Sequence, residues 1–492
     1  MRNTMKNRSG RLLALALLGV VSVLQSCGTE GASGNSADNG DGAATITFWT
    51  TLGHDKLDLI NNQLLPQFYE ETGHKYTINV TGGTDYDSLY AKIKTALSAG
   101  TQPTMAFAYP DHAATYLGSN SIVALDDYVA DPEVGFTIAD GSHEDENGNV
   151  VYGADDFVTN YWDEGKNIYN HGVADPSLYT VPFFKSTEVM YYNKSFLDAY
   201  SIPVPKTFAE LMATARAIQA ADNNFTKDDY WPVIVDSDSN LVITASIQNG
   251  WPYTDPTAEN PFLFDNAQTR GFVKDLYGYH KDHLLLTKGS APNQTYSSNY
   301  FTDSKAIFAI GSSGGASFNK GGDFEIGVAQ VPYFNANNIK YIQQGPAVSL
   351  FRRATAAQKK GAWLFYKFVS RTDISLALAL STGYDPVRIS SLESDRYTST
   401  ITSDVREDVD NPSATRPISN NSLLPMVSYM SKKYAENGYF YTTPAFVGSA
   451  EGRDAIGNAV AGVLTSTSAD IDNTIDEQFK TAMADAVKGL GY

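Results

Sequence analysis

The sequence predicts an α/β fold with mostly parallel sheets. Between residues 46 and 109, short β-branched and aromatic runs alternate with segments whose apolar residues recur every three or four positions. This order reads strand, helix, strand, helix, strand, and residues 179–236 repeat it. Such alternation favours a parallel sheet covered by helices. Ligands of these sheets bind beyond the carboxyl ends of the strands, here residues 50–54 and 109–111.

Each element of the first region has its own signal. Strands are expected at residues 46–49, 76–80 and 105–109. The helix after the first strand should be kinked or shifted by Pro66, and Gly73 ends it. Its apolar face is formed by Leu57, Ile60, Leu64, Leu65 and Phe68. A second helix carries Tyr86, Leu89, Ile93 and Leu97 and stops at Gly100.

The middle of the chain continues the pattern. A long strand is expected at 179–192, a helix at 207–221, strands at 232–236 and 306–310, and a helix at 363–370. Residues 140–156 are polar around Asn147-Gly148, which is typical of a surface hairpin or loop. No internal repeat of about 20–50 residues is visible.

The N-terminus predicts export. Four basic residues precede an apolar run at residues 12–24, which is shorter than the roughly 20 residues that span a membrane and fits a secretory signal. Leu24-Gln25-Ser26-Cys27 resembles a bacterial lipobox, in which the cysteine thiol receives a diacylglyceryl group. Cys27 is the only cysteine, so it cannot form an internal disulfide. An ordinary cleaved signal with an accidental cysteine is the alternative.

Residues 27–44 are expected to be a flexible tether, because they are rich in Gly, Ser, Ala, Asn and Asp and lack large apolar side chains. No second transmembrane candidate follows. Removal of residues 1–26, which hold four basic and no acidic side chains, takes the net charge from −19 to −23. Such a charge disfavours nucleic acid and anionic lipid as partners.

Several ordered motifs carry a resemblance to a known family. They are Ile46-Thr47-Phe48-Trp49, Phe68-Tyr69-Glu70-Glu71-Thr72-Gly73, Leu97-Ser98-Ala99-Gly100-Thr101-Gln102-Pro103, Val181-Pro182-Phe183-Phe184, Pro205-Lys206-Thr207-Phe208, Ile310-Gly311-Ser312-Ser313, Gln344-Gly345-Pro346 and Thr382-Gly383-Tyr384-Asp385-Pro386. Over residues 45–492 the chain resembles the extracellular solute-binding proteins of carbohydrate-importing ABC systems, the group that includes maltose-binding and glycerol-3-phosphate-binding proteins.

The resemblance implies two α/β lobes joined by crossing hinge segments near residues 186, 345 and 389, with ligand in the cleft between them. The N-terminal lobe would hold residues 45–185 and 346–388, and the C-terminal lobe residues 186–345 and 389–492. It further implies a monomeric protein of the cell envelope without enzymatic activity, cofactor or metal, and the lipobox-like run adds the expectation of a lipid anchor at Cys27. Its partners would be a small-molecule ligand, permease subunits of an ABC importer and, through Cys27, the membrane.

Ligand-binding positions follow partly from the resemblance and partly from local chemistry. Tyr86 matches a family tyrosine that reaches the cleft, and Ser186 and Glu188 lie at the first crossing. Asp111 follows a strand end, where a carboxylate accepts sugar hydroxyls or caps a helix. Ser312 and Ser313 follow another strand and open a helix whose N–H groups favour an oxygen-rich ligand.

A second group of positions completes the expected site. Trp251 and Tyr384 are candidates for packing on sugar rings, and Gly345 allows a close backbone approach at the second crossing. Phe446 stands where glycerol-phosphate-binding relatives carry a phosphate-holding arginine. Arg388 and Lys185 remain candidate substitutes for that arginine.

Three local patterns imitate other functions. Gly311-Ser312-Ser313-Gly314-Gly315 matches a hydrolase nucleophile elbow, but all seven histidines precede it. The stretch from Asp222 imitates a calcium loop, yet Lys227 and Val233 replace the required glycine and glutamate. His280 and His283 lack a third metal ligand nearby in the sequence. These patterns predict surface loops and caps.

The ligand is expected to be a sugar or oligosaccharide. Glycerol 3-phosphate, or a phosphodiester, is the first alternative, and a secreted glycoside hydrolase is the second, since paired carboxylates cannot be recognised from sequence spacing. A structural or adhesive lipoprotein is a third alternative.

Overall fold

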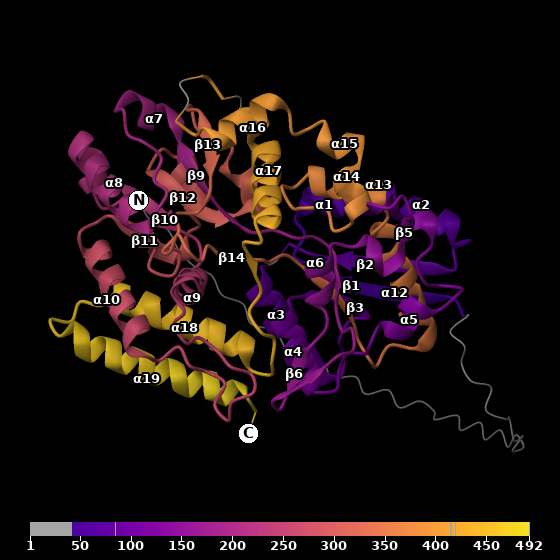
Figure 1. Ribbon diagram of the computed structural model, residues 1–492. Coiled ribbons are helices and arrows are strands. Elements are labelled where there is room, and N and C mark those ends of the chain that lie inside the picture. Colours follow the sequence, from indigo (N-terminus) through magenta and orange to yellow (C-terminus); the bar gives the residue numbers. More distant parts are fainter. Residues whose placement is uncertain (1–41, 84, 414–415, 419, 492) are drawn as a thin grey trace, which may run out of the picture. The chain divides into compact units, whose positions relative to one another are not determined.

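The computed structural model describes residues 42–83, 85–413, 416–418 and 420–491, which belong to one compact unit spanning Asn39–Tyr492 (Figure 1). The expected signal peptide, Cys27 and nearly all of the expected tether lie outside the described residues. Within the described ranges, no helix has both the length and the apolar character that a membrane crossing requires. The fold is mixed α/β, as the sequence predicts.

The first sheet has five strands in the order β2-β1-β3-β15-β8. Strand β1 runs parallel to β2 and β3, whereas β15 runs antiparallel to β3 and β8. The strands are β1 (Ala44–Trp49), β2 (Tyr76–Thr81), β3 (Met105–Ala108), β8 (Val181–Pro182) and β15 (Ala347–Leu350).

The second sheet has five strands in the order β11-β10-β12-β9-β13. Strand β10 runs parallel to β11 and β12, and β9 runs antiparallel to β12 and β13. The strands are β9 (Glu188–Asn193), β10 (Trp231–Val235), β11 (Leu285–Thr287), β12 (Ala306–Ser312) and β13 (Ile326–Ala329).

Three short strand pairs lie outside these sheets. Strand β14 (Tyr341–Ile342) pairs in parallel with β16 (Phe440–Tyr441). The antiparallel pairs are β4 (Ser142–Glu144) with β5 (Val150–Tyr152), and β6 (Ile168–Asn170) with β7 (Val173–Asp175). The pair β4–β5 confirms the expected hairpin around Asn147-Gly148.

Nineteen α-helices connect and cover the strands within the described part of the chain. Their bounds are α1 (His54–Leu59), α2 (Leu65–Glu71), α3 (Tyr86–Ala99), α4 (Pro110–Gly118), α5 (Asp126–Ala130), α6 (Thr159–Asp163), α7 (Lys194–Ala199), α8 (Phe208–Ala221), α9 (Asp238–Asn249), α10 (Ala267–Lys281), α11 (Ser297–Thr302), α12 (Ala356–Val369), α13 (Thr372–Leu380), α14 (Ile389–Glu393), α15 (Asp395–Thr398), α16 (Ser403–Asp410), α17 (Leu423–Glu436), α18 (Ser449–Leu464) and α19 (Ile471–Gly489).

Local sequence signals explain several of these boundaries. A π-helical turn (Ile60–Leu64) separates α1 from α2, and Pro66 lies in the first turn of α2, where its missing N–H costs nothing. Helix α3 ends at Gly100, whose φ of 71° is left-handed. Thr207 and Glu210 form a capping box at the start of α8.

The expected long strand at residues 179–192 is wrong. The chain leaves the first sheet after β8 and enters the second sheet at β9, so residues 183–187 connect the two sheets. Both ends of the run are core strands, and its middle is buried although it contains the polar residues Lys185, Ser186 and Thr187. Periodicity alone cannot reveal such a change of sheet.

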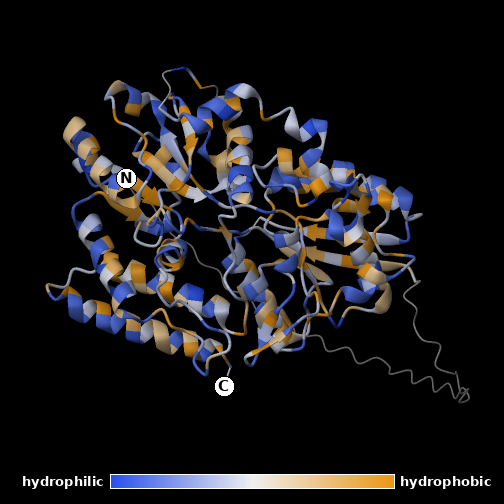
Figure 2. Ribbon diagram, in the orientation of Figure 1, coloured by the Kyte–Doolittle hydropathy of each residue, from blue (hydrophilic) through white to orange (hydrophobic). Residues whose placement is uncertain are grey.

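Each sheet has its own hydrophobic core. The first contains Phe48, Phe107 and Phe365, and the second contains residues of α8–α10 and α16–α19. Figure 2 shows hydrophobic residues gathered on the strands of both sheets, while the helices carry mixed faces. Burial of each large apolar side chain stabilises the fold by roughly 1.5–3 kcal/mol. Each sheet and its helices are therefore stabilised by their own hydrophobic core.

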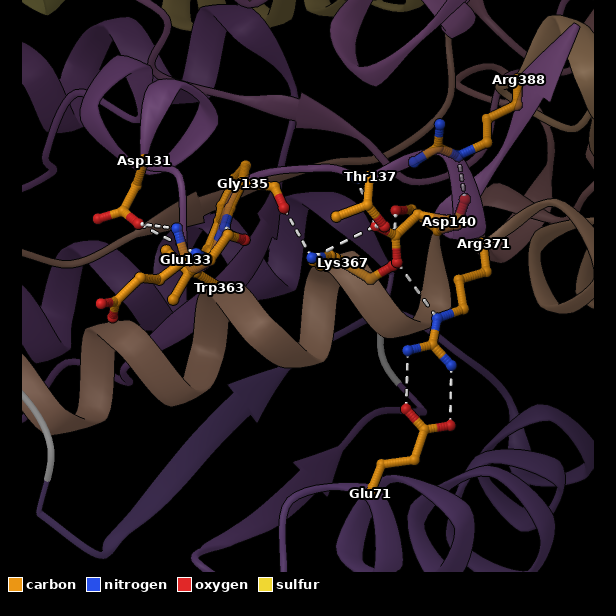
Figure 3. Close-up of polar contacts among 12 residues, drawn as sticks. Glu71, Asp131, Glu133, Gly135, Thr137, Asp140, Trp363, Lys367, Arg371 and Arg388 are labelled. Carbon is orange, nitrogen blue, oxygen red and sulfur yellow. Dashed lines mark hydrogen bonds and ion pairs between the residues drawn. The ribbon is translucent and has the colours of Figure 1, made fainter.

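A polar cluster anchors residues 131–140 to α12 and the start of α13 (Figure 3). Asp140 lies 3.3 Å from Lys367 and 3.4 Å from Arg371, and both nitrogens of the Arg371 fork bind Glu71 at 2.8 and 2.7 Å. Lys367 also donates to the carbonyl of Gly135 at 2.6 Å. Bidentate arginine contacts fix orientation as well as distance.

Arg388 lies beside this cluster with no solvent exposure. Its Nη1 binds Oδ2 of the fully buried Asp156 at 3.0 Å, and its Nε donates to the carbonyl of Ser370. The guanidinium lies 4.2 Å from the ring centroid of Phe157. Burial lowers the pKa of Arg388, and Asp156 opposes that change. The arginine is thus held inside the fold through Nη1 and Nε, while its buried Nη2 has no hydrogen-bond partner among the described residues.

Replacement of Asp156 should therefore be costly. Asp156→Ala leaves a buried, unpaired guanidinium, so we expect the free energy of unfolding to fall by about 3–5 kcal/mol in urea denaturation. The control is Asp282→Ala, which removes a partner of Arg216 in a pair whose side chains are 59% and 52% exposed; it should cost less than about 1 kcal/mol. Equal losses in the two variants would contradict this account.

Candidate functional site

A cavity of about 520 Å³ is lined by residues that follow strands of both sheets. Tyr109, Pro110 and Asp111 follow β3 of the first sheet. Asp236 follows β10, Lys288 follows β11, and Ser312 ends β12 of the second sheet. The carboxyl ends of parallel strands meet at one edge, which makes this the expected ligand position in such sheets.

Charge dominates the lining of the cavity. Seven carboxylates contribute: Asp87, Asp111, Glu164, Glu188, Asp236, Asp238 and Asp454. Three permanently charged cations face them, namely Lys185, Lys288 and Arg453. Serine, asparagine, glutamine and threonine side chains supply further donors and acceptors, including Ser237, Asn240, Gln344 and Thr442. The lining therefore suits a solute with many hydrogen-bonding groups.

Each of the three cations has an identifiable contact. Lys185 forms a buried ion pair with Glu164, whose side chain is 5% exposed. Lys288 lies 4.0 Å above the ring centroid of Tyr296. Arg453, on α18, donates to Oδ1 of Asn240. Arg453 and Lys288 lack a carboxylate contact within ion-pair distance among the described residues, so they are the cations best placed to meet a ligand.

Glu188, at the start of β9 in the second sheet, has a strongly shifted pKa. Its side chain is buried, and its Oε1 accepts a hydrogen bond from Nδ2 of Asn240 at 2.8 Å. Burial raises the pKa of Glu188 to about 7, although Asn240 and Arg453 favour the ionised form. A carboxyl group with such a pKa can donate or accept hydrogen bonds near neutral pH.

Asp454 also lines the cavity and lies close to other acidic side chains. Its pKa is raised to about 7, first by burial and then by the charges of Asp87 and Asp111. Those two residues lie at the starts of α3 and α4, whereas Asp454 lies on α18. A ligand that donates hydrogen bonds to these carboxylates would replace repulsion with attraction.

Four of the sequence-predicted positions line the cavity: Asp111, Lys185, Glu188 and Ser312. Asp111 is not the N-cap of α4, because Tyr109 holds that position; its Oδ1 instead accepts from the backbone N–H of His112 at 2.8 Å. Ser312 precedes a 3₁₀ helix (Ser313–Asn319) rather than an α-helix, and its hydroxyl accepts from the N–H of Gly314 at 3.2 Å.

Four predicted positions do not line the cavity but contact other residues of the protein. Tyr86 packs on Tyr109 with ring centroids 4.5 Å apart. Tyr384 stacks on Phe184 at 5.2 Å, and Ser313 donates its backbone N–H to the carbonyl of Thr187 at 2.8 Å. Ser186 exchanges backbone hydrogen bonds of 2.7 and 2.9 Å with Gln344.

Gly345 makes the expected close approach, toward protein rather than ligand. Its φ is 113°, and a Cβ there would lie 2.5 Å from the carbonyl oxygen of Phe184. Only glycine fits this contact between the first and second connecting segments without strain. Gly345 does not line the cavity.

The remaining predicted positions pack against other protein groups. Trp251 packs on Phe272 with centroids 5.9 Å apart, and Phe446 packs on Phe262 at 5.5 Å. Arg388 is held by Asp156, as described above. Residues 50–54, which the strand-end rule also indicated, do not line the cavity.

The sequence analysis did not predict most of the cavity-lining residues that follow strands of the second sheet. Asp236, Ser237, Asp238, Ser239 and Asn240 follow β10 directly, so the strand-end rule could have found them. Lys288 follows β11 in the same way. Arg453 and Asp454 lie on α18 and had no local signal; only the packing of α18 against α9 brings them to the cavity.

The imitating motifs have structural roles. His280 stacks on Trp231 with ring centroids 5.0 Å apart, and the tilted ring of His283 lies 3.7 Å from the Trp231 centroid. Asp222 caps a 3₁₀ turn by accepting from the N–H of Asn224. Across the described ranges, no group of three or more His, Cys, Asp or Glu side chains is arranged to hold a metal ion.

The raised pKa of Glu188 makes stability depend on pH. The unfolded chain loses this proton near pH 4.5 and the folded chain near pH 7, so the free energy of unfolding falls as pH rises through that window. Glu188→Gln keeps the acceptor for Asn240 and removes the titration. We expect its stability relative to wild type to rise by about 3 kcal/mol between pH 4.5 and pH 8.

The measurement is urea denaturation across this pH range. Glu259→Gln, at an exposed position, is the matched control and should show no pH-dependent difference from wild type. A flat difference for Glu188→Gln would mean that folding does not raise the pKa of Glu188.

Comparisons with known proteins agree with this architecture. A family model for bacterial extracellular solute-binding proteins matches residues 63–404. The sn-glycerol-3-phosphate-binding periplasmic protein UgpB of Brucella abortus is 26% identical over 232 residues, 44% of this chain and 51% of that protein. The chain thus spans about half the length of the curated relatives it matches.

Solved structures share the fold at low sequence identity. UgpB from Mycobacterium tuberculosis, in complex with glycerophosphocholine, is 17% identical with a TM-score of 0.65, covering 91% of this chain and 99% of that one. Maltose-bound MalE3 of T. maritima is 15% identical with a TM-score of 0.64, covering 91% and 99%. The family model spans more than half of the chain, and the protein therefore belongs to the bacterial extracellular solute-binding protein family.

Proposed function

We propose that this protein captures a sugar or oligosaccharide outside the cytoplasmic membrane and delivers it to the permease of an ABC importer. The observation that carries this proposal is the cavity of about 520 Å³, lined by polar side chains at the strand ends of both sheets. Carboxylates such as Asp111 and Glu188 accept hydrogen bonds from sugar hydroxyls. Sugar-binding proteins among the structural neighbours, including maltose-bound MalE3, support this ligand class.

Ligand capture would proceed by closure of two lobes. We assign residues 45–185 and 346–388 to the N-terminal lobe, and residues 186–345 and 389–492 to the C-terminal lobe. Contacts between α3 and α18 would then join the lobes: Glu451 Oε1 accepts from Lys94 Nζ and from the Tyr90 hydroxyl, both at 2.7 Å. Ligand that contacts both lobes favours the closed state, which is how such hinge motions are driven.

A phosphate ester such as glycerol 3-phosphate is the second candidate ligand. The position of Arg453 favours it, since the guanidinium lies at the cavity and contacts Asn240 rather than a carboxylate. An arginine can bind a phosphate with two parallel hydrogen bonds. The seven carboxylates of the lining repel a dianion. A sugar is therefore the first candidate ligand, ahead of a phosphate ester.

Isothermal titration calorimetry separates the two ligand classes. We expect a saccharide in a panel of mono-, di- and trisaccharides to bind, and Asp111→Ala to weaken it at least about tenfold, the usual scale for a charge-assisted hydrogen bond. Asp127→Ala, at an exposed position on α5, is the control. Small-angle scattering should show a smaller radius of gyration with saturating ligand.

If wild type bound glycerol 3-phosphate but no saccharide, and Arg453→Met abolished that binding, glycerol 3-phosphate would be the ligand in place of a sugar. Unchanged scattering with a bound ligand would rule out lobe closure.

We further propose that Cys27 carries a lipid that holds the exported protein at the cell envelope. The lipobox-like run 24–27 and the polar residues after it support this anchor. A tether of this composition would let a binding protein move near its membrane partner.

Cys27→Ala should release the protein from membranes or leave it as unprocessed precursor. Fractionation of cells and mass spectrometry of the mature N-terminus measure this outcome. Thr29→Ala, which keeps the cysteine, should fractionate like wild type. An unmodified N-terminus downstream of residue 27 in the wild type would contradict the anchor.

A further inference from the structure

A second cavity adjoins the first. It has a volume of about 420 Å³. Five residues line both cavities: Pro110, Glu164, Gln343, Thr442 and Thr443. The two cavities are therefore neighbours with one common wall.

The common wall is a hydrogen-bonded unit centred on Glu164. Its carboxylate accepts from Nε2 of Gln343, from the hydroxyl of Thr442 at 2.9 Å, and from Nζ of Lys185. The side chains of Lys185 and Glu164 are 2% and 5% exposed. Oε1 of the buried Gln343 has no hydrogen-bond partner among the described residues. Hydrogen bonds to Glu164 therefore fix the common wall, and Oε1 of Gln343 is an acceptor without a donor.

The two cavities differ in their chemistry. Six of the seven carboxylates of the first are absent from the second, which shares only Glu164 and adds Asp163, 3.4 Å from Lys166. Aromatic and small apolar groups take their place: Tyr169, Phe440, Tyr441, Pro444 and Ala445. Aromatic faces pack well on the C–H faces of sugar rings.

Backbone contacts hold these aromatic residues in position. Tyr441 belongs to β16, opposite Ile342 of β14, and its carbonyl accepts from the N–H of Gln343 at 2.8 Å. Tyr169 donates its N–H to the carbonyl of Ala445 at 2.8 Å. Tyr441 is partly exposed and lines the second cavity, so its ring can meet a ligand.

We propose that the ligand is elongated, with one sugar unit in the charged cavity and a second, uncharged sugar unit against Tyr441 in the aromatic cavity. This inference rests on the proposed function and adds the length of the ligand and the place of its second unit. A monosaccharide would occupy one cavity and leave the other to water. A ligand that extends along the residues shared by the two cavities meets both types of lining.

Calorimetry with two length series tests this arrangement: glucose, maltose and maltotriose, and mannose, mannobiose and mannotriose. In a series that binds wild type, the disaccharide should bind at least about tenfold more tightly than the monosaccharide. Tyr441→Ala should remove this advantage and change monosaccharide affinity less than about threefold. Tyr441→Phe, which keeps the ring, should restore disaccharide affinity to within about threefold of wild type.

Tyr439→Ala is the matched control, because Tyr439 packs near Tyr341 and Tyr434 and lines neither cavity. It should keep the length dependence, and thermal melting of every variant checks folding. Equal affinity for mono- and disaccharide, or equal weakening of both by Tyr441→Ala, overturns the inference and leaves the proposed function standing. Failure of wild type to bind any saccharide of either series overturns the proposed sugar ligand and this inference with it.

Discussion

Lys185 and Glu164 form a buried ion pair, and the segments that connect the two sheets meet around it. Lys185 exchanges backbone hydrogen bonds with Asp385, and the next residue, Ser186, does the same with Gln344. The side chain of Lys185 reaches Glu164, which also receives Gln343 and Thr442. Breaking a buried ion pair leaves an uncompensated charge. Separate stretches of the chain are therefore fixed to one another at the wall of the cavity.

The cavity next to this wall is unusually acidic, and its chemistry follows from that excess. Burial raises the pKa of Glu188, and the carboxylates of Asp87 and Asp111 add to the effect of burial at Asp454. An empty site of this kind holds unfavourable charge. A ligand rich in hydroxyl groups supplies donors to those oxygens without adding negative charge. The negative charge of these carboxylates weakens the binding of a phosphate group, except next to the cation of Arg453.

Much of the fold could be predicted from local signals. A few neighbouring residues are enough to predict each of these features: the strands of the first region, the helix shift at Pro66, the helix end at Gly100 and the capping box at Thr207. The strand-end rule also located Asp111. It could not exclude residues 50–54, because which strand ends face the cavity depends on how both sheets pack.

The site was harder to predict because its residues come from distant segments. Arg453 reaches the cavity through the packing of α18 on α9, a contact that no local pattern encodes. Arg388 is the reverse case. Its charge indicates a functional role, yet Asp156, far away in sequence, holds it in the interior. Long-range partners decide whether a charged side chain meets ligand or protein, and a single sequence does not name them.

The order of strands along the chain has a consequence for folding. All strands of the second sheet lie between β8 and β15 of the first, so the first sheet is completed only by a strand that follows the second sheet entirely. Closing a contact over a long unfolded loop costs entropy, and a compact insert shortens that loop. The strands of the second sheet can therefore pair within a nearly continuous stretch, and their pairing brings β15 close to β3 before helices α16–α19 complete the second core. The nested topology thereby gives the polypeptide a preferred order of assembly.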